Sequence, residues 1–529
     1  MSESPGAAGR VSAAIAISRI LGLVRECVQA KYFGAGFAVD AFSVAFRIPG
    51  MLRDLFAEGT LGAAFLPAFA RRLEFDGEES AWLLANRLIN ALLIILGAVT
   101  LVFFFGAKFL VYIQAAGFAA VPGKLELTTL MARILSPFLL CVSLAAVFMG
   151  MLNACGSFFI PALASSVFNV CCILAGVFLS QFMPRLGMEP IVAMAIGALV
   201  GGCGQFAIML PSVRARGFRW HWTPDFSDVD LRRIGRLVLP AVLGLSATQI
   251  NIVVDNQIAS MYGDGPVSWL GYAFRIAQLP IGVFGIAIAM VAAADTSHYA
   301  AVKDFPALER TLGTSLRLAA CLTFPATAGL VFFRHEIVQL LFQRDQFTPA
   351  DAAATAQVLP YYAFILFAYS AVKIMAPAFY ALGDNRTPVR ISIITVLSKV
   401  VLNLILFKPL GVPGIAASTT AAAWLNYFAL RRRLGCISSS ADSTRVDGEG
   451  FSAYSRIALA SVVMGLLTRT VFAVSGYIIT GAGTTALGVR LCLAIIAGIG
   501  SIIPLLEFFR VKEAGELRHV AVRFMRKFR

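Results

Sequence analysis

The sequence has little charge and few groups that could bind a metal or catalyse a reaction. Only 14% of its 529 residues are Asp, Glu, Lys or Arg, and it contains four histidines. Its nine cysteines lie mostly inside apolar segments, and none is spaced as CxxC, so they predict small buried side chains. The phosphate-binding pattern GxxxxGK[ST] does not occur, which argues against ATP binding by this chain. We therefore expect no cofactor and no metal.

Apolar residues dominate instead. They make up 59% of the chain, and the mean hydropathy is +0.80, whereas soluble domains are about half apolar. Runs of about 20 apolar residues recur from end to end, which is the length needed to cross a bilayer. Lipid tolerates only helices or closed barrels, and no segment alternates like a barrel strand. We therefore predict an all-α polytopic membrane protein.

We predict about 14 membrane-spanning helices, each near the length that a bilayer requires. Their approximate limits are 11–33, 38–70, 82–112, 125–152, 158–182, 188–213, 232–262, 266–296, 311–333, 352–382, 388–407, 411–431, 453–475 and 486–509. No short basic region, apolar segment and cleavage site come before the first of them. We expect that first span to act as the targeting signal.

Basic residues are unevenly divided between the two ends of these spans. They gather in the connections after spans 2, 6, 8, 10, 12 and 14, and the net charge is +15. The opposite connections, such as YIQAAGFAAVPG and MYGDGP, are nearly free of Lys and Arg. The positive-inside rule then places both termini in the cytoplasm and accounts for the net charge without nucleic acid. The basic tail LRHVAVRFMRKFR is expected to lie on anionic headgroups.

Short motifs recur at nearly constant spacing. NACGSFFIP aligns with YALGDNRTP, and AFRI occurs twice at almost the same offset. This spacing predicts two parallel six-helix lobes related by an axis along the membrane normal. The expected parts are an N-terminal lobe at 1–215, a C-terminal lobe at 216–435, and a linker with spans 13 and 14 and the tail at 436–529.

Charged side chains interrupt the second span at membrane depth. Its stretch VDAFSVAFRIPGMLRDLFAEG carries Asp40, Arg47, Arg53, Asp54 and Glu58. On an unbroken helix all of these except Arg53 fall within about 40° of one another. A kink at the Pro-Gly pair in this stretch would bring Arg53 towards the same face. The span therefore presents one strongly polar side.

The first and eighth spans carry similar polar faces. An arc of about 120° on span 1 holds Ser18, Arg19, Gly22, Arg25, Glu26 and Gln29, and span 8 adds Arg275 and Gln278. An Arg facing lipid at mid-bilayer would cost about 2.5–3.5 kcal/mol, so these side chains must face water, one another or an anionic ligand. We predict a central cationic cavity between the lobes, because excess Arg suits a phosphate-bearing substrate. The alternative is internal ion pairing, such as Arg19 with Glu26 or Arg47 with Asp40.

Several long motifs resemble the MurJ/MviN family of bacterial lipid II flippases. They are SRILGLVRE, FGAGFAVDAFSVAFRIPGMLRDLFAEGTLGAAFLP, LPIGVFGIAIA, VKIMAPAFYALGDNRTPV and LNLILFKPLGVPGIA. That family belongs to the multidrug/oligosaccharidyl-lipid/polysaccharide exporter superfamily. The resemblance implies flipping of lipid II, an undecaprenyl-diphosphate disaccharide pentapeptide, from the inner to the outer leaflet of the cytoplasmic (inner) membrane for peptidoglycan synthesis.

The resemblance also assigns substrate-binding residues by position. They are Ser18, Arg19 and Arg25 in span 1, Asp40, Arg53 and Glu58 in span 2, and Arg275 in span 8. The sequence departs from the family pattern at three places. Gly50 stands where Asn is usual, Asp54 where a second basic residue is common, and Ala294-Asp295 where a proline is usual. The first two departures put the fine polarity of the cavity in doubt, but not the fold.

The energy source follows from the charge of the substrate. Moving about two negative charges outwards across an inside-negative 100 mV releases roughly 4–5 kcal/mol, so the membrane potential alone could drive export. Whether Na⁺ or H⁺ resets the carrier is left open. Asp255 with Asn251, one turn earlier in span 7, is a candidate cation site, although a hydrogen bond between helices explains the pair at least as well.

Other functions compete with this interpretation. A flippase for another polyprenyl-diphosphate sugar or a cation-coupled multidrug exporter would share the fold, but drug exporters favour acidic, aromatic cavities. A membrane glycosyltransferase or diphosphatase could use Asp225, Asp228 and Asp230 as metal ligands. A capping box of Ser227 and Asp230 at the start of span 7 explains these acids better, so we expect no enzyme. A scaffold for cell-wall synthesis machinery would not need Arg at membrane depth.

Overall fold

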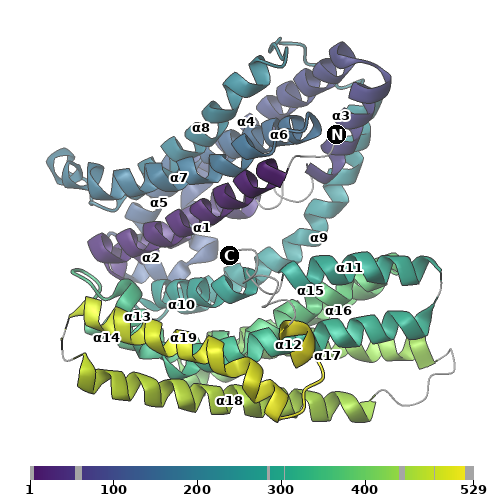
Figure 1. Ribbon diagram of the computed structural model, residues 1–529. Helices are drawn as coiled ribbons and strands as arrows, with labels where there is room; N and C mark the ends of the chain where they lie inside the picture. Colours follow the sequence, from purple (N-terminus) through teal and green to yellow (C-terminus); the bar gives the residue numbers. More distant parts are fainter. Residues whose placement is uncertain are drawn as a thin grey trace. The chain divides into compact units, whose positions relative to one another are not determined.

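The computed structural model describes residues 5–53, 62–282, 286–302, 304–439, 447–479, 481 and 483–518. These residues form α-helices and short 3-10 helices joined by turns, and no β-strand occurs among them (Figure 1). The predicted all-α fold is confirmed.

The helices of the first half of the chain follow the predicted spans closely. They are α1 (Pro5–Phe33), α2 (Phe37–Arg53), α3 (Gly62–Phe75), α4 (Glu78–Gln114), η2 (Ala116–Ala120), α5 (Lys124–Leu135), α6 (Phe138–Ala154), α7 (Phe159–Val177), η3 (Leu179–Gln181), η4 (Met183–Leu186), α8 (Val192–Arg214) and α9 (Val229–Ser260).

The second half continues in the same way. Its helices are α10 (Pro266–Pro280), α11 (Ile286–Ala301), α12 (Phe305–Phe332), α13 (Arg334–Phe342), α14 (Pro349–Ala363), α15 (Ile365–Ala381), α16 (Arg386–Leu410), α17 (Val412–Ser439), α18 (Asp447–Ile478) and α19 (Thr484–Phe508).

Some predicted spans consist of two helices. These are the spans expected at 125–152 and 352–382, whereas those expected at 38–70 and 266–296 include residues outside the described ranges. The break at Ser136–Pro137 has a clear cause, because proline has no backbone N–H to donate and the chain tightens there. Ser136 N donates to Arg133 O at 3.2 Å, three residues back instead of four. The short helix α13 was not predicted.

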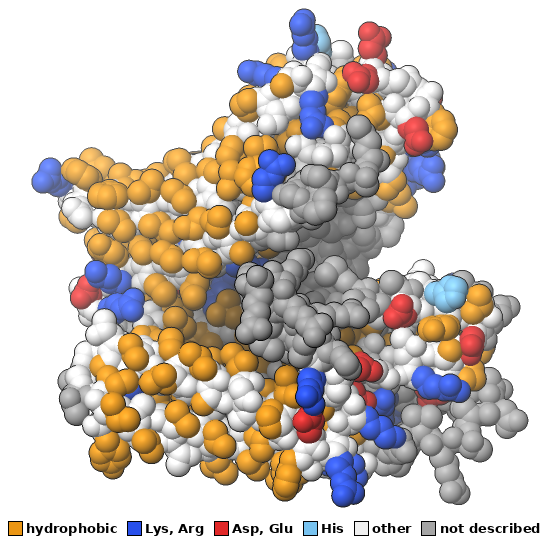
Figure 2. All heavy atoms as spheres, in the orientation of Figure 1, with side chains coloured by type: hydrophobic (Ala, Val, Ile, Leu, Met, Phe, Trp, Pro, Cys, Tyr) orange, Lys and Arg blue, Asp and Glu red, His pale blue; other side chains and the backbone are white. Residues whose placement is uncertain are grey.

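Nine helical segments in the described part of the chain are long and apolar enough to cross a membrane. The charged spans 1, 2 and 8 are not among them, and the total of 14 stays a prediction. Apolar side chains cover broad surfaces of both units, as Figure 2 shows in orange. A surface of this kind is stable in lipid, so the chain is a multi-pass membrane protein.

The chain divides into two compact units. Unit 1 comprises residues 1–268 and 344–348, and unit 2 comprises 269–343 and 349–529. The division places α9 in unit 1, and α18 and α19 in unit 2. The three parts expected from the sequence, at 1–215, 216–435 and 436–529, stay a prediction.

Small residues allow close helix packing in unit 1. A Cβ added to Gly197 on α8 would lie 2.4 Å from the Cβ of Ala175 on α7. One added to Gly201 would lie 2.9 Å from the ring of Phe168. Both contacts are too short for any side chain, so these glycines allow α7 and α8 to approach in the manner typical of membrane helices.

In unit 2 the two C-terminal helices pack against the rest of the unit. A Cβ added to Gly465 on α18 would lie 2.4 Å from the ring of Phe332 on α12. A Cβ added to Gly498 on α19 would lie 3.0 Å from Thr468 on α18. Spans 13 and 14 are therefore tightly packed members of unit 2.

Candidate functional site

The residues predicted to bind substrate lie on three helices. Those described are Ser18, Arg19 and Arg25 on α1, Asp40 and Arg53 on α2, and Arg275 on α10. Glu58 and Asp54 lie outside the described residues. Unit 1 holds the five on α1 and α2, whereas unit 2 holds Arg275.

Arg25 is a mostly buried cation on α1. Its Nη2 donates to Oε1 of Glu26 at 2.6 Å, and both side chains are 13% exposed. The guanidinium also lies 5.4 Å from the ring centroid of Phe168 on α7. Glu26 therefore pairs with its neighbour and not with Arg19, so the alternative pair Arg19–Glu26 is wrong. Arg19 is exposed, and it has no ion-pair partner among the described residues.

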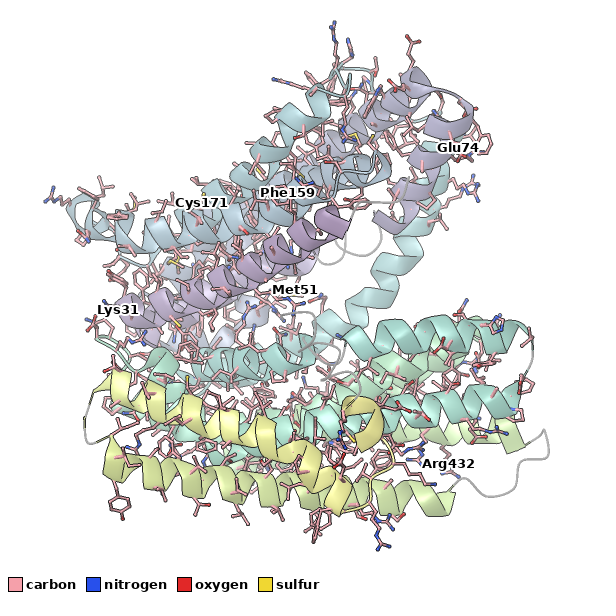
Figure 3. The ribbon with its side chains drawn as sticks, in the orientation of Figure 1. Lys31, Met51, Glu74, Phe159, Cys171 and Arg432 are labelled. Carbon is pink, nitrogen blue, oxygen red and sulfur yellow. The ribbon has the colours of Figure 1, made fainter. Side chains whose placement is uncertain are left out.

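Ser18 and Gly22 lie where α1 packs on α7. Asn169 Nδ2 donates to the backbone oxygen of Ser18 at 3.2 Å, and a Cβ added to Gly22 would lie 3.7 Å from the same amide. In Figure 3, α7 carries the label Cys171, and α1 carries the label Lys31 near its end. The two helices lie side by side. A side chain at position 22 would therefore make ordinary contact with Asn169, and packing does not require a glycine there.

Asp40 is fully buried and accepts hydrogen bonds on both carboxylate oxygens. Lys124 Nζ donates to Oδ2 at 3.0 Å, and Gly265 N donates to the same atom at 2.7 Å. Ser268 donates to Oδ1 through its backbone N at 2.8 Å and through its hydroxyl. The carboxylate thus joins α2 to the first residues of α5 and α10. The alternative pair Arg47–Asp40 is wrong, because Lys124 takes that place.

Lys124 was missed by the sequence reasoning. It is 0% exposed, its Nζ lies 2.6 Å from Oδ1 of Asp264, and it lies 4.3 Å from the ring centroid of Phe118. A signal was present, because Lys124 is the only basic residue in a connection that otherwise lacks them. A single Lys in such a connection predicts a buried ion pair and not a solvated side chain. Its partners here are Asp40 and Asp264.

The end of α2 carries Arg53 in its last turn. Its side chain is half-buried, and the helix continues through Pro49 to this residue. A Cβ added to Gly50 would meet no atom of the described residues within 4 Å. The Cβ of an asparagine, the usual family residue there, would therefore meet none of these atoms.

Arg275 is presented on the exposed side of α10. It and Gln278 are exposed, whereas Tyr272, Ala273 and Ile276 on the same helix are buried in unit 2. The helix therefore has one apolar face against its own unit and one polar face turned away from it. This arrangement is what a residue that meets a charged ligand requires.

The predicted cation site on α9 contains one unsatisfied oxygen. Asp255 and Asn251 are half-buried, and the buried Oδ1 of Asn251 has no hydrogen-bond partner among the described residues. No group of three His, Cys, Asp or Glu side chains able to hold a metal occurs in the described part of the chain. The assignment of this pair to a cation stays a prediction.

The acids around the start of α9 bind arginines. Arg72 Nε donates to Asp230 at 2.7 Å, and its Nη2 donates to both oxygens of Asp228 at 3.0 Å. Arg71 Nη2 donates to Asp230 at 3.1 Å. Arg87 bonds both Asp228 and Asp225, the latter at 2.8 Å. These carboxylates therefore tie α9 to α3 and α4, which leaves them poorly suited to hold a catalytic metal.

The helix cap differs from the predicted one by a residue. Asp228, and not Ser227, caps α9, because its Oδ1 accepts from the backbone N of Asp230 at 2.9 Å and of Leu231 at 3.1 Å. Ser227 instead donates to Asp225. The capping box failed because the neighbouring carboxylate binds both the backbone and two arginines.

Replacing Asp228 by Asn should destabilise unit 1 in a pH-dependent way. Burial raises the pKa of Asp228, but hydrogen bonds from Leu231 and Arg72 outweigh burial, and the pKa lies below its usual value. The charge therefore stabilises the fold above about pH 3.9 and is lost as the pH falls through the lowered pKa.

We expect Asp228→Asn to lower the free energy of unfolding by about 1.5–3 kcal/mol near pH 7, because Asn keeps the cap but loses the charge-assisted bonds. The difference from the unmodified protein, measured by thermal unfolding, should shrink as the pH falls towards about 3. Asp225→Asn is the control and should cost less, because Asp225 is more exposed. A pH-independent difference would contradict the role of the charge.

Comparison with solved structures defines the class of protein. The fold resembles a structure described as "Lipid II flippase MurJ, inward closed conformation", with a TM-score of 0.76 and 24% identity, covering 94% of this chain and 98% of that one. It also resembles an inward-facing multidrug resistance MATE family transporter of the MOP superfamily, with a TM-score of 0.67 and 18% identity, covering 80% and 96%. The fold is that of helical membrane transporters.

Sequence comparison then identifies the family. Residues 29–482 match the family described as "Lipid II flippase MurJ". The "Probable lipid II flippase MurJ" of Vibrio cholerae is 35% identical over 437 residues, covering 80% of this chain and 81% of that protein. That of Rhizobium meliloti is 35% identical over 413 residues, covering 77% and 76%. The chain belongs to the lipid II flippase MurJ family, which confirms the resemblance seen in its motifs.

Proposed function

We propose that this protein flips lipid II from the inner to the outer leaflet of the bacterial cytoplasmic membrane by alternating access. The observation that carries the proposal is the family match over residues 29–482. A phosphate-bearing substrate also accounts for an excess of arginine at membrane depth, which the cationic substrate of a multidrug exporter would not. The proposed activity is transport and not catalysis.

In this proposal the arginines bind the diphosphate. Arg19, Arg25, Arg53 and Arg275 are the candidates, and one Arg–phosphate pair at about 4 Å with an effective dielectric near 20 contributes roughly 4 kcal/mol. Ser18 and Glu58 would orient the guanidiniums or reach the sugars. Asp40 acts differently, because its two oxygens already accept four hydrogen bonds. We assign it to positioning the helices and not to contact with substrate.

The remaining features of the proposal concern energy and placement. The membrane potential drives the outward step, and Na⁺ or H⁺ at Asp255 and Asn251 would reset the carrier. Both termini lie in the cytoplasm, following the basic connections. The polyprenyl tail stays in the bilayer, beside α18 and α19. Cell-wall synthesis enzymes are the expected partners on the outer side.

Depletion of the protein tests the substrate. Cells that lose it should accumulate lipid II on the inner leaflet, and outer-leaflet lipid II, measured by labelling in intact cells, should fall at least about tenfold. Re-expression should restore it. Accumulation of a different polyprenyl-diphosphate sugar would support the nearest alternative, and unchanged lipid pools with altered drug resistance would support a multidrug exporter.

Replacing Arg275 by Ala should strongly reduce export. The exposed guanidinium on α10 is the proposed contribution of unit 2 to diphosphate binding, and one lost charge-assisted contact of about 1.5–3 kcal/mol lowers the rate about 10–100-fold. Arg310→Ala is the matched control, because Arg310 is an exposed Arg of unit 2 on α12. Undiminished export by Arg275→Ala at normal protein levels would remove Arg275 from the site.

A further inference from the structure

Unit 2 contains a cavity that the proposed transport cycle does not use. Its volume is about 500 Å³, within the range of ligand pockets. The walls come from the start of α13, from α14, and from the turn between α16 and α17. The residues used below are Arg334, Gln357, Tyr361, Phe364, Leu410 and Pro413.

One cation dominates the polar part of this cavity. Arg334 Nε donates to Nε2 of His335 at 3.2 Å, and no acidic side chain of the described residues pairs with the guanidinium. Glu336, the acid nearest in sequence, is bound by Arg469 on α18. Gln357 and Tyr361, which have polar side chains, also line the cavity. The cavity is therefore complementary to an anion with hydrogen-bonding oxygens.

Two of the residues that line the cavity are apolar and exposed. Phe364 is 53% exposed and Leu410 is 39% exposed. Residues of α16 that lie before Leu410 continue this character, since Val401, Leu404 and Ile405 are all exposed. A cation that suits an anion, together with an exposed apolar surface, matches the two parts of an amphipathic lipid.

The wall formed by α14 is held in place by α17. The helix breaks at Phe364, between α14 and α15, which leaves carbonyl oxygens without their usual donors. Thr420 Oγ1 donates to Tyr361 O at 2.5 Å, and Trp424 Nε1 donates to Phe364 O at 3.0 Å. These bonds satisfy the broken helix inside the membrane, so the cavity wall is a built feature of unit 2.

The cavity lies near the ends of the spans that are expected to face the outer leaflet. The connection from α12 to α13 and the turn from α16 to α17 lie at the span ends opposite the basic connections. With the proposed orientation these ends face outwards. We infer that this cavity binds an anionic glycerophospholipid of the outer leaflet, with its phosphate on Arg334 and its acyl chains along Phe364 and Leu410.

Native mass spectrometry of the full-length protein tests this inference. The probes are phosphatidylglycerol and phosphatidylcholine with the same acyl chains, added to delipidated protein. We expect one phosphatidylglycerol to bind more tightly than phosphatidylcholine, and Arg334→Ala to weaken that binding at least about fivefold. Arg185→Ala is the matched control, because Arg185 is an exposed Arg at the same predicted side, in unit 1. It should leave the binding unchanged.

A second variant and a soluble probe complete the test. Leu410→Trp fills the cavity while keeping Arg334, and it should also weaken phosphatidylglycerol binding, so the test does not depend on the folding of Arg334→Ala. Glycerol 3-phosphate should not displace the lipid. Equal binding of phosphatidylglycerol by both variants and the unmodified protein would overturn the inference. Displacement by glycerol 3-phosphate would show a soluble-anion site instead. Neither outcome bears on lipid II export, which is measured separately.

Discussion

Replacing Lys124 by Met is expected to destabilise the protein by about 3–5 kcal/mol, the usual cost of breaking a buried ion pair from one side. The substitution keeps an unbranched side chain of similar length but leaves the carboxylate of Asp40, which is 0% exposed, without a counter-charge. Gly265 and Ser268 would remain as neutral donors. Thermal unfolding of the purified protein should therefore occur at a clearly lower temperature.

A double variant separates the pair from its surroundings. Lys124→Met combined with Asp40→Asn should recover part of the lost stability, because no buried charge then stands alone. Lys31→Met is the matched control. Lys31 pairs with Asp345 at 3.6 Å, but these side chains are 45% and 64% exposed, so we expect a change of about 0–1 kcal/mol. Equal effects of Lys124→Met and Lys31→Met would mean that the buried position of Lys124 is unimportant.

Replacing Arg25 by Ala is expected to abolish most lipid II export. Arg25 is the most enclosed of the proposed diphosphate ligands on α1, and a charge-assisted bond lost from a poorly hydrated site costs about 1.5–3 kcal/mol or more. That corresponds to a reduction of about 10–100-fold in outer-leaflet lipid II. Arg25→Lys should retain more export than Arg25→Ala, because it keeps the charge but loses the planar fork.

The ion pair with Glu26 offers a simpler explanation, and a double variant distinguishes the two. If Arg25 serves only to neutralise Glu26, the combination of Arg25→Ala and Glu26→Gln should restore export. If Arg25 binds the diphosphate, the combination should stay as poor as Arg25→Ala. Arg10→Ala is the control, because Arg10 is an exposed Arg on the same helix. Protein levels in the membrane must match for all variants.

Helix identity was accessible from sequence because lipid imposes a simple rule. Every apolar run of bilayer length had to be helical, so the expected limits of spans such as 82–112 and 188–213 fall close to α4 and α8. Breaks within a span were harder to predict from the sequence. At the break at Phe364, the carbonyl oxygens of Tyr361 and Phe364 accept from Thr420 and Trp424, about 60 residues away in the chain, and the sequence around Phe364 does not predict those donors.

The protein partners of the charged residues could not be found from spacing along one helix. Helical periodicity placed Asp40 and Arg47 on one face, and their pairing was the alternative to a cationic cavity, but Asp40 binds Lys124, which is 84 residues away. The predicted cap at Ser227 was wrong for the same reason. Asp228 caps α9 instead, and its carboxylate also binds Arg72 and Arg87, which are distant in the chain. Spacing along one helix tells which side chains share a face, but it does not tell what lies opposite that face.

Composition and hydrophobic run length decided that this chain is a helical membrane protein, and its motifs decided the family, because both kinds of information are local to the chain. Folding decided which charges meet. Lys124, and not an arginine of α2, neutralises Asp40, and arginines of α3 and α4 bind the acids around the start of α9. The reason is physical: a buried charge must find a counter-charge in space, and helix packing brings together partners that lie far apart in the chain.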